Sequence, residues 1–241
     1  MRGKELLSCA SLVALVAVPI FARSRGEPET AYASSRINTK VVGQKNAALP
    51  TAKGTALRLV LASTGNAARY RVRERLVGHH FPNDAVGETK SLTGAISFDS
   101  NGKVIREASK FTVDASTFVS DQNRRDGFVR GRLLEADDYP VITLVPTEAR
   151  GVSLPLPTTG SRTIEMTADL TVRGVTRPTT WKGSAQFKDG QVKGSASTAF
   201  TFDDIQMEQP RVPVLLSVAD TIRLEINFNR LEINFNFVRE P

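Results

Sequence analysis

Short segments of alternating polarity run along the chain from residue 69 onward. In Leu92-x-Gly94-x-Ile96-x-Phe98, for example, apolar or small residues occupy every second position. Side chains two residues apart lie on the same face of a β-strand, so this period predicts strands with one buried face. Further segments of the same kind begin near residues 70, 111, 141, 164, 181 and 200. About eight strands are therefore expected.

Polar turns separate the strand-like segments, and no long helical patterns alternate with them. Residues 99–102 (Asp-Ser-Asn-Gly) and 188–191 (Lys-Asp-Gly-Gln) have the composition of hairpin turns. One stretch, residues 119–138, lacks the alternation and is expected to be helical or irregular. The pattern predicts an all-β, antiparallel fold, either a sandwich or a closed barrel.

The N-terminal residues have the pattern of an export segment. Arg2 and Lys4 precede an uncharged, mainly apolar stretch at residues 6–22. This stretch is shorter than the about 20 residues usual for a membrane-spanning helix, which favours a cleaved signal peptide over a signal anchor. Residues 1–33 are assigned to a signal peptide or signal anchor, with cleavage after Ala22 or Ala33. The protein is thus expected to be exported, periplasmic or secreted, and membrane-anchored if the signal is retained.

The region between this segment and the first strand has the composition of a linker. Residues 34–68 are rich in Ala, Ser, Thr, Gly and Asn, and we expect a flexible connection there. An apolar patch at residues 56–62 predicts an added element, either a strand or a helix. The folded domain is expected over residues 69–241.

A direct repeat lies near the C-terminus. The seven residues 223–229 (Arg-Leu-Glu-Ile-Asn-Phe-Asn) recur at residues 230–236. Because seven is odd, a continuous strand would turn the apolar residues of the two copies to opposite faces, unless a bulge or break intervenes. We expect a small duplication that lengthens the last strand beyond the barrel, and not a second functional element.

Charge and cysteine content narrow the possible functions. The net charge is +7, but basic and acidic residues are interspersed without a dense basic stripe, so nucleic-acid binding is not expected. The single cysteine, Cys9, lies near the start of the apolar stretch and not at its end, which argues against lipidation. A mature domain without cysteine can have no disulfide and no thiolate catalyst.

No motif for catalysis or metal binding is present. The two histidines, His79 and His80, are adjacent, and adjacent strand positions point in opposite directions. A metal site using His79, Asp84 and Glu88 is the weaker alternative. The sequence contains no Gly-x-Ser-x-Gly, phosphate-loop or His-Glu-x-x-His motif. We therefore expect no enzyme, no catalytic residue, no metal and no cofactor.

Three motifs in order carry a family resemblance. They are Asp121-Gln-Asn-Arg-Arg-Asp126, Tyr139-Pro140 and the stretch Leu-Thr-Val-Arg-Gly-Val-Thr-Arg-Pro at residues 170–178. Together they resemble the YceI-like family of bacterial periplasmic polyisoprenoid-binding proteins, over roughly residues 69–229. Phe128 stands where many members carry His, and residues 131–133 lie near their Asp-Phe-Phe segment, so the loop over the barrel mouth is expected to differ.

The resemblance implies a lipocalin-like, eight-stranded antiparallel barrel with an internal tunnel for a long isoprenoid chain, no catalysis and often a homodimer. Aromatic residues of the expected strands and loop would either fill this interior or line the tunnel, and the resemblance favours lining. These tunnel candidates are Phe98, Phe111, Phe118, Phe128, Trp181, Phe187, Phe200, Phe202 and Phe228. Arg124 and Arg125, flanked by Asp121 and Asp126, are expected to form a structural ion-pair cluster, with contact to a ligand headgroup as the alternative.

The expected function is therefore a non-catalytic carrier for a polyisoprenoid or isoprenoid quinone in the bacterial cell envelope. Its partner would be a hydrophobic small molecule or lipid, with peripheral or anchored contact to a membrane. The alternative is an interaction or structural module with a filled barrel. Such a module would dock to an envelope partner through the apolar run at residues 206–218.

Overall fold

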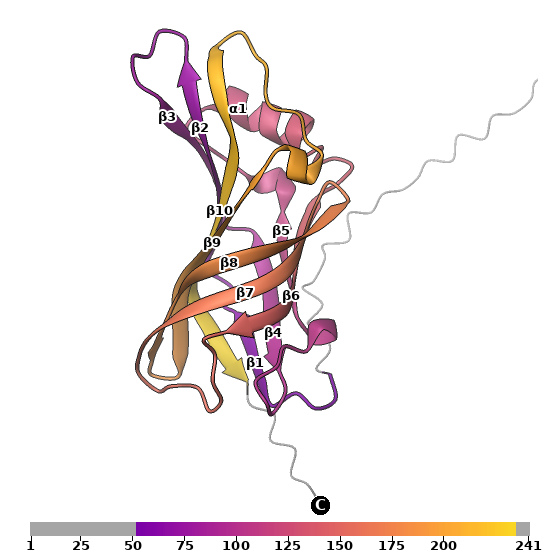
Figure 1. The fold of residues 1–241 in the computed structure, drawn as a ribbon, viewed down its shortest axis with the longest axis vertical. Coiled ribbons are helices and arrows are strands. Elements are labelled where there is room, and N and C mark those ends of the chain that lie inside the picture. Colours follow the sequence, from indigo (N-terminus) through magenta and orange to yellow (C-terminus); the bar gives the residue numbers. More distant parts are fainter. Residues whose placement is uncertain (1–51, 235–241) are drawn as a thin grey trace, which may run out of the picture. The chain divides into compact units, whose positions relative to one another are not determined.

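The computed structural model describes residues 52–234, with side chains as far as residue 228. Ten strands form one antiparallel sheet (Figure 1), which confirms the expected all-β class. The strands are β1 (Leu57–Leu61), β2 (Ala67–Leu76), β3 (Asn83–Thr89), β4 (Leu92–Phe98), β5 (Lys110–Asp114), β6 (Val141–Arg150), β7 (Gly160–Val172), β8 (Val175–Lys188), β9 (Gln191–Thr201) and β10 (Leu215–Asn234).

The strand pairings run nearly all the way around a barrel. The order is β1-β4-β5-β6-β7-β8-β9-β10-β2-β3, and β10 pairs with β1 as well. Along one edge of β10, residues 215–227 pair with β2 and residues 231–234 pair with β1. At this second pairing the barrel is closed. At the other end the barrel remains open. There β3 pairs with β2 on one side, and its other side makes only one isolated bridge, from Glu88 to Val119.

Two long strands are each interrupted, which explains ten strands where about eight were expected. β1 and β2 lie end to end along β10, separated by residues 62–66. β3 and β4 likewise lie end to end along β2 and β1, separated by residues 90–91. Counted as two interrupted strands, these four elements occupy two of eight positions around the barrel.

The folded region begins earlier than the residue 69 at which the sequence analysis placed its start. The apolar patch at residues 56–62 forms β1, so part of the predicted linker belongs to the sheet. Leu57, Leu59 and Leu61 are buried in the core. The small polar residues between β1 and β2 give this interrupted strand the composition of a linker.

The C-terminal repeat lies within β10. Pairing with β9 shifts register between Phe228 and Leu231, so the irregularity that the odd repeat length requires is present. The expectation that the second copy lengthens the last strand beyond the barrel was wrong for the residues that the structure describes. Residues 231–234 of this copy pair with β1, and this pairing closes the barrel. β1 lies along the same edge of β10 as β2, but nearer to the C-terminal end of β10. Residues 235–241 lie outside the described part of the chain.

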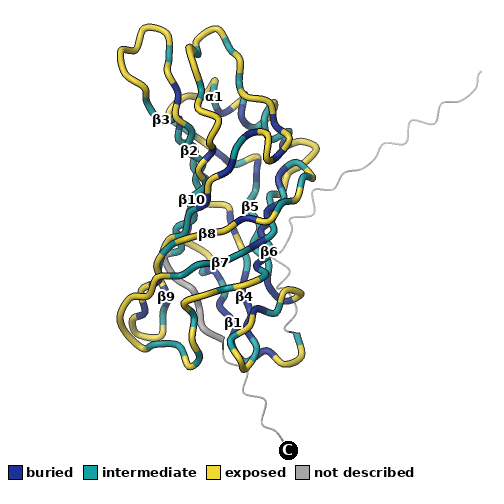
Figure 2. Tube along the Cα trace, in the orientation of Figure 1, coloured by how far each residue is buried: buried dark blue, intermediate teal, exposed yellow. Residues whose placement is uncertain are grey.

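The interior holds two neighbouring apolar clusters. One surrounds Phe98 and Phe187, and the other surrounds Trp181 and Phe202. Trp181 Nε1 donates a hydrogen bond to Thr179 Oγ1 (2.9 Å), so the indole is buried with its polar atom satisfied. Buried and exposed residues alternate along several barrel strands, as Figure 2 shows, while the hairpin ends are mostly exposed.

Short helical turns lie where the strand pattern stops. Helix α1 (Asn123–Phe128) and the turn at Val129–Leu133 fall inside the stretch 119–138 that was predicted to be helical or irregular. In Figure 1, α1 lies at the end of the barrel from which the β2–β3 hairpin projects. Within residues 52–234 there is no helix of the length and apolar character that a membrane span requires. The expected export segment, residues 1–33, lies outside the described residues.

Close approach of β8 and β9 predicts a stability defect at Gly183. A Cβ there would lie 1.9 Å from the Ser195 carbonyl oxygen, so Gly183→Ala must separate the two strands. We expect it to lower the free energy of unfolding by about 1–3 kcal/mol, as overpacking does. Gly127→Ala in α1 is the control, because a Cβ there meets open space. Urea denaturation of both variants measures the difference, and equal stabilities would contradict the close approach.

Candidate ligand-binding cavity

An apolar cavity of about 170 Å³ lies inside the barrel. Its walls come from every strand except β3, from the loop between β6 and β7, and from Phe118 after β5. Leu59, Ile96, Leu170 and Val192 are among the aliphatic lining residues. Apolar cavities of this order of size remain dry and bind small hydrocarbons. The site can therefore accept the hydrophobic part of a ligand.

Six of the nine aromatic tunnel candidates line this cavity. They come from both apolar clusters and from strands far apart in the sequence. The six are Phe98, Phe111, Phe118, Trp181, Phe187 and Phe228. Whether they contact a ligand remains a prediction.

The other three candidates do not line the cavity. Phe200 and Phe202 are buried near the end of β9, where Ile205 and Met207 from the following turn pack into the same cluster. The interior is filled at that level of the barrel. Phe128 lies in α1 and is only half-buried. Alternation along a strand identifies the inward face, but it does not tell at which level the interior is hollow.

Sequence reasoning missed part of the wall formed by the loop at residues 151–159. Val152 and Leu156 line the cavity, and Leu154 packs against the adjoining cluster. The signal was present as an alternation of apolar residues, Val-x-Leu-x-Leu, in residues 152–156. Because it contains prolines and lies between longer strand-like segments, the sequence predicted only an ordinary loop there.

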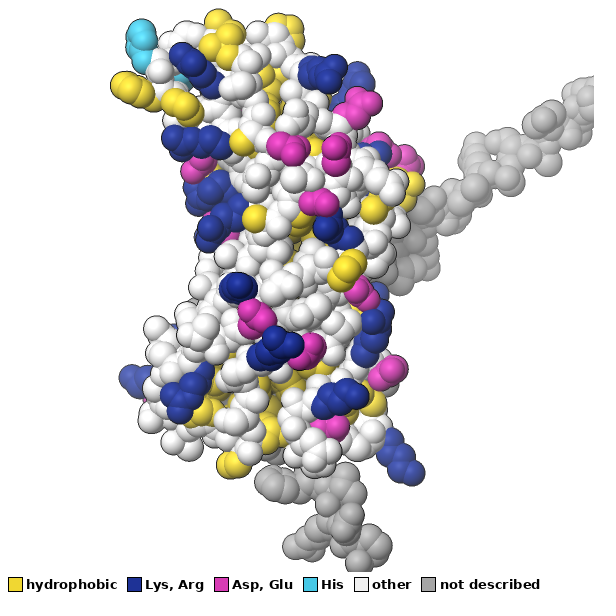
Figure 3. All heavy atoms as spheres, viewed as in Figure 1, with side chains coloured by type: hydrophobic (Ala, Val, Ile, Leu, Met, Phe, Trp, Pro, Cys, Tyr) yellow, Lys and Arg dark blue, Asp and Glu magenta, His cyan; other side chains and the backbone are white. Residues whose placement is uncertain are grey.

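Charged side chains at the cavity wall are paired with partners. Arg69 forms an ion pair with Glu88. Glu225 accepts a hydrogen bond from Arg223 (2.9 Å), and Glu165 lies 3.8 Å from Lys182 Nζ. Figure 3 shows hydrophobic side chains between scattered basic and acidic ones on the lower half of the molecule. Because these charges are neutralised by neighbours, the wall favours an uncharged ligand segment.

A polar cluster adjoins the cavity at Phe118. The centroids of the Tyr70 and Phe118 rings are 5.6 Å apart. The Tyr70 ring also covers Gly87, where an added Cβ would lie 2.2 Å from the ring. Arg125 Nη2 donates to Glu74 (2.7 Å), and the guanidinium also pairs with Asp121. These contacts attach α1 to β2.

The two candidate headgroup residues are placed differently. Arg125 is largely buried and forms ion pairs with Glu74 and Asp121. This is the structural ion-pair arrangement expected from the sequence. Asp126 accepts hydrogen bonds from the amide and hydroxyl of Ser120 (2.8 and 2.6 Å), which fixes the loop before α1. Arg124 is exposed, and its contact with a headgroup remains a prediction.

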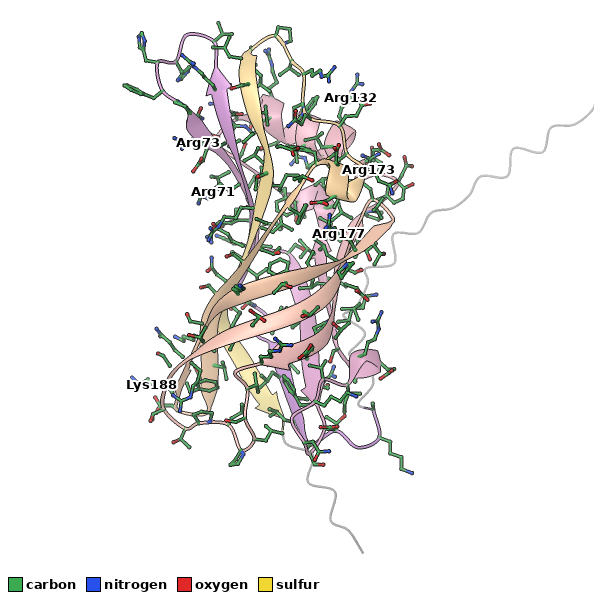
Figure 4. All side chains as sticks on the ribbon, viewed as in Figure 1. Arg71, Arg73, Arg132, Arg173, Arg177 and Lys188 are labelled. Atoms are coloured by element: carbon green, nitrogen blue, oxygen red, sulfur yellow. The ribbon has the colours of Figure 1, made fainter. Side chains whose placement is uncertain are left out.

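The motif at residues 170–178 forms the hairpin between β7 and β8. Arg173 and Gly174 make the turn with φ of 49° and 75°. Arg173 Nη2 bonds to Glu135 (2.6 Å), and Arg177 pairs with Asp204. Figure 4 shows the two arginines on this hairpin. Neither residue lines the cavity, so the motif holds the hairpin against neighbouring turns.

No group of three or more metal-ligating side chains is assembled in the described part of the chain. Asp84, one member of the weaker metal-site alternative, binds Arg71 and Arg73, which Figure 4 shows on β2. Glu88 pairs with Arg69. Both carboxylates are thus occupied by arginines.

Comparison with known proteins identifies the domain. A family model described as the YceI-like domain matches residues 64–230. A UPF0312 protein from Pseudomonas putida strain GB-1 is 32% identical over 133 residues, which are 52% of this chain and 64% of the relative. The match thus spans a little under two thirds of the relative's length.

Two solved structures share the fold. One is a polyisoprenoid binding domain from Saccharophagus degradans implicated in plant cell wall breakdown, at 14% identity and a TM-score of 0.54, covering 75% of this chain and 99% of that one. The other is Burkholderia cenocepacia BcnA, at 13% identity and a TM-score of 0.51, covering 72% and 99%. At such identities the likeness extends to the fold alone.

Burial of Tyr70 predicts a late step in an alkaline titration. Burial raises the pKa of Tyr70 to about 12, whereas the pKa of an unfolded tyrosine is about 10. The stabilisation from this group is therefore complete below about pH 10 and is lost as the pH rises through 12. Phenolate absorbance should show a step near the upper value that disappears in Tyr70→Phe. A wild-type titration complete near pH 10 would contradict the burial of this ring.

Proposed function

The chain belongs to the YceI-like family, and on this basis we propose that it is a non-catalytic carrier that holds a long apolar ligand inside its barrel. The ligand class that fits is a polyisoprenoid or an isoprenoid quinone. One observation carries the proposal: the barrel interior contains a cavity whose wall is almost entirely hydrocarbon.

The energetics favour a slender hydrocarbon chain. Each methylene buried in such a cavity contributes about 0.8 kcal/mol, so the segment of an isoprenoid chain that enters it gains affinity without a polar contact. At about 170 Å³, the cavity is smaller than the 300–1,000 Å³ typical of pockets for drug-sized molecules. A thin chain suits it better than a bulky ring system. The absence of a free charge at the lining residues described above fits the same class.

The solved relative from Saccharophagus degradans, described as a polyisoprenoid binding domain, supports this ligand class. Because one fold can serve many functions, the choice of ligand rests on the cavity and not on the shared architecture. We place the carrier in the bacterial cell envelope, as a periplasmic or secreted protein, on the pattern of residues 1–33.

The first test is native mass spectrometry of the protein purified from its own host, followed by organic extraction. A stoichiometric isoprenoid lipid would establish the carrier and identify its cargo. A protein that is empty, and that also fails to take up added isoprenoid quinone, would overturn the proposal in favour of a filled interaction module. The same spectra report whether the chain forms the homodimer that the family resemblance implies.

Filling the cavity should weaken ligand binding. Ala149 on β6 lines the cavity, so Ala149→Phe places a ring where ligand carbons would lie. Displacing about two methylenes of the ligand weakens binding roughly tenfold. Quinone titration by native mass spectrometry or ligand fluorescence measures the change.

Ala199→Phe is the matched control, because Ala199 is exposed on β9 and does not line the cavity. Thermal unfolding of both variants checks that each still folds. If Ala149→Phe does not fold, Ala149→Leu replaces it in the binding measurement. Equal affinities for the cavity variant and the control would place the ligand elsewhere.

A further inference from the structure

Two loops at the open end of the barrel carry a concentration of exposed apolar side chains. Val77 and Phe81 lie in the β2–β3 hairpin, and Val214 and Leu216 lie where β10 begins. Their exposed fractions are 56%, 82%, 49% and 58%. We call these four residues the apolar tip. They make up four of the seven large hydrophobic residues that are exposed in the described part of the chain.

The two loops form one surface. The Val77 amide donates to the Val214 carbonyl oxygen (3.0 Å), which joins the hairpin to the start of β10. A register shift between Leu215 and Ser217 leaves Leu216 outside the regular pairing with β2. Figure 1 shows the hairpin and the start of β10 projecting together, and Figure 3 shows hydrophobic and histidine side chains at this end. The tip thus stands away from the cavity.

The two loops of the apolar tip carry basic residues and no carboxylate of their own. Residues 75–82 and 211–216 contain two arginines, two histidines and no carboxylate. Arg75 and Arg211 are exposed, and neither forms an ion pair within residues 52–234. Arg211 nevertheless lines a surface pocket together with Asp203, Glu208 and Asp220. By contrast, Arg71 and Arg73, a little further along β2, both bind Asp84. Arg75 is therefore the cation at the apolar tip that is available to an anionic partner.

We propose that the apolar tip docks the barrel onto the surface of an anionic lipid bilayer. Phe81, Val77, Val214 and Leu216 enter the interfacial region, and Arg75 meets a lipid phosphate. An apolar apex flanked by cations is the arrangement that binds such interfaces. The four side chains stand on projecting loops, and they fall far short of the roughly 800 Å² per partner that a stable protein interface needs. This surface goes beyond the carrier proposal and does not depend on the identity of the ligand.

A tryptophan reporter tests the docking directly on the full chain. Trp181 is the only tryptophan and is 2% exposed, so it gives a constant background. In Phe81→Trp, we expect emission to shift to the blue with phosphatidylglycerol vesicles and to be quenched by brominated lipid. The reporter senses the tip itself, so membrane binding by residues 6–22 cannot imitate the signal. Tyr139→Trp is the matched control, since Tyr139 is an aromatic residue 41% exposed outside both loops.

Charge variants in the Phe81→Trp background test the arginines. Arg75→Gln should raise the lipid concentration for half-maximal shift about fivefold. Arg211→Gln should raise it less, because Arg211 lies beside Asp203, Glu208 and Asp220. Lys188→Gln removes the same charge at the end of the barrel opposite the apolar tip, as Figure 4 shows, and should leave the titration unchanged.

Several outcomes would overturn the docking. One is a reporter whose emission stays unchanged at saturating anionic lipid, even if the chain sediments with vesicles. Another is an equal shift with phosphatidylcholine alone and no effect of either arginine. A shift that depends on protein concentration without lipid would assign the tip to a second copy of the chain.

Discussion

Backbone pairing along β10 holds the barrel together, because this one strand contacts β9 along one edge and both β2 and β1 along the other. Where β10 pairs with β1 the barrel closes, and the wall is complete enough to surround a cavity. Where it pairs only with β2, the wall ends in a projecting hairpin. The hollow interior and the exposed tip are thus two consequences of one long strand.

The level at which the interior is filled decides where a ligand can lie. Near the end of β9, Phe200 and Phe202 meet Ile205 and Met207, and the space between them closes. Nearer to β1, the side chains of Leu59, Phe98 and Phe187 leave a hollow lined by hydrocarbon. Both levels use the same inward face of the strands, and each receives side chains from a loop. Ile205 and Met207 pack with Phe200 and Phe202, whereas Val152 and Leu156 line the hollow.

The strand pattern was predictable from the sequence, and the exact interior was not. Alternation from Leu92 to Phe98 marked β4, and the motif at residues 170–178 marked the hairpin between β7 and β8. β1 was ambiguous because it is a short apolar patch in a polar region and because it buries a charge, Arg58, which donates to Ser97 Oγ and the Ala108 carbonyl oxygen. Pairing partners that lie 39 and 50 residues away leave no local signal. Three of the aromatic candidates missed the cavity for other reasons: Phe200 and Phe202 pack with the turn that follows β9, and Phe128 lies in α1 and not on a barrel strand.

The arginines of the barrel differ in environment, and this difference links stability to function. Those against the barrel wall, such as Arg69 and Arg125, are partly buried and have carboxylate partners. Removing a guanidinium from water is costly unless an opposite charge compensates, so such partners are a condition of folding. Arg75 remains in water and needs no such partner to fold. A planar cation left free beside exposed apolar side chains keeps its full capacity to bind phosphate, so the chain separates the charges that stabilise its barrel from those available to a membrane.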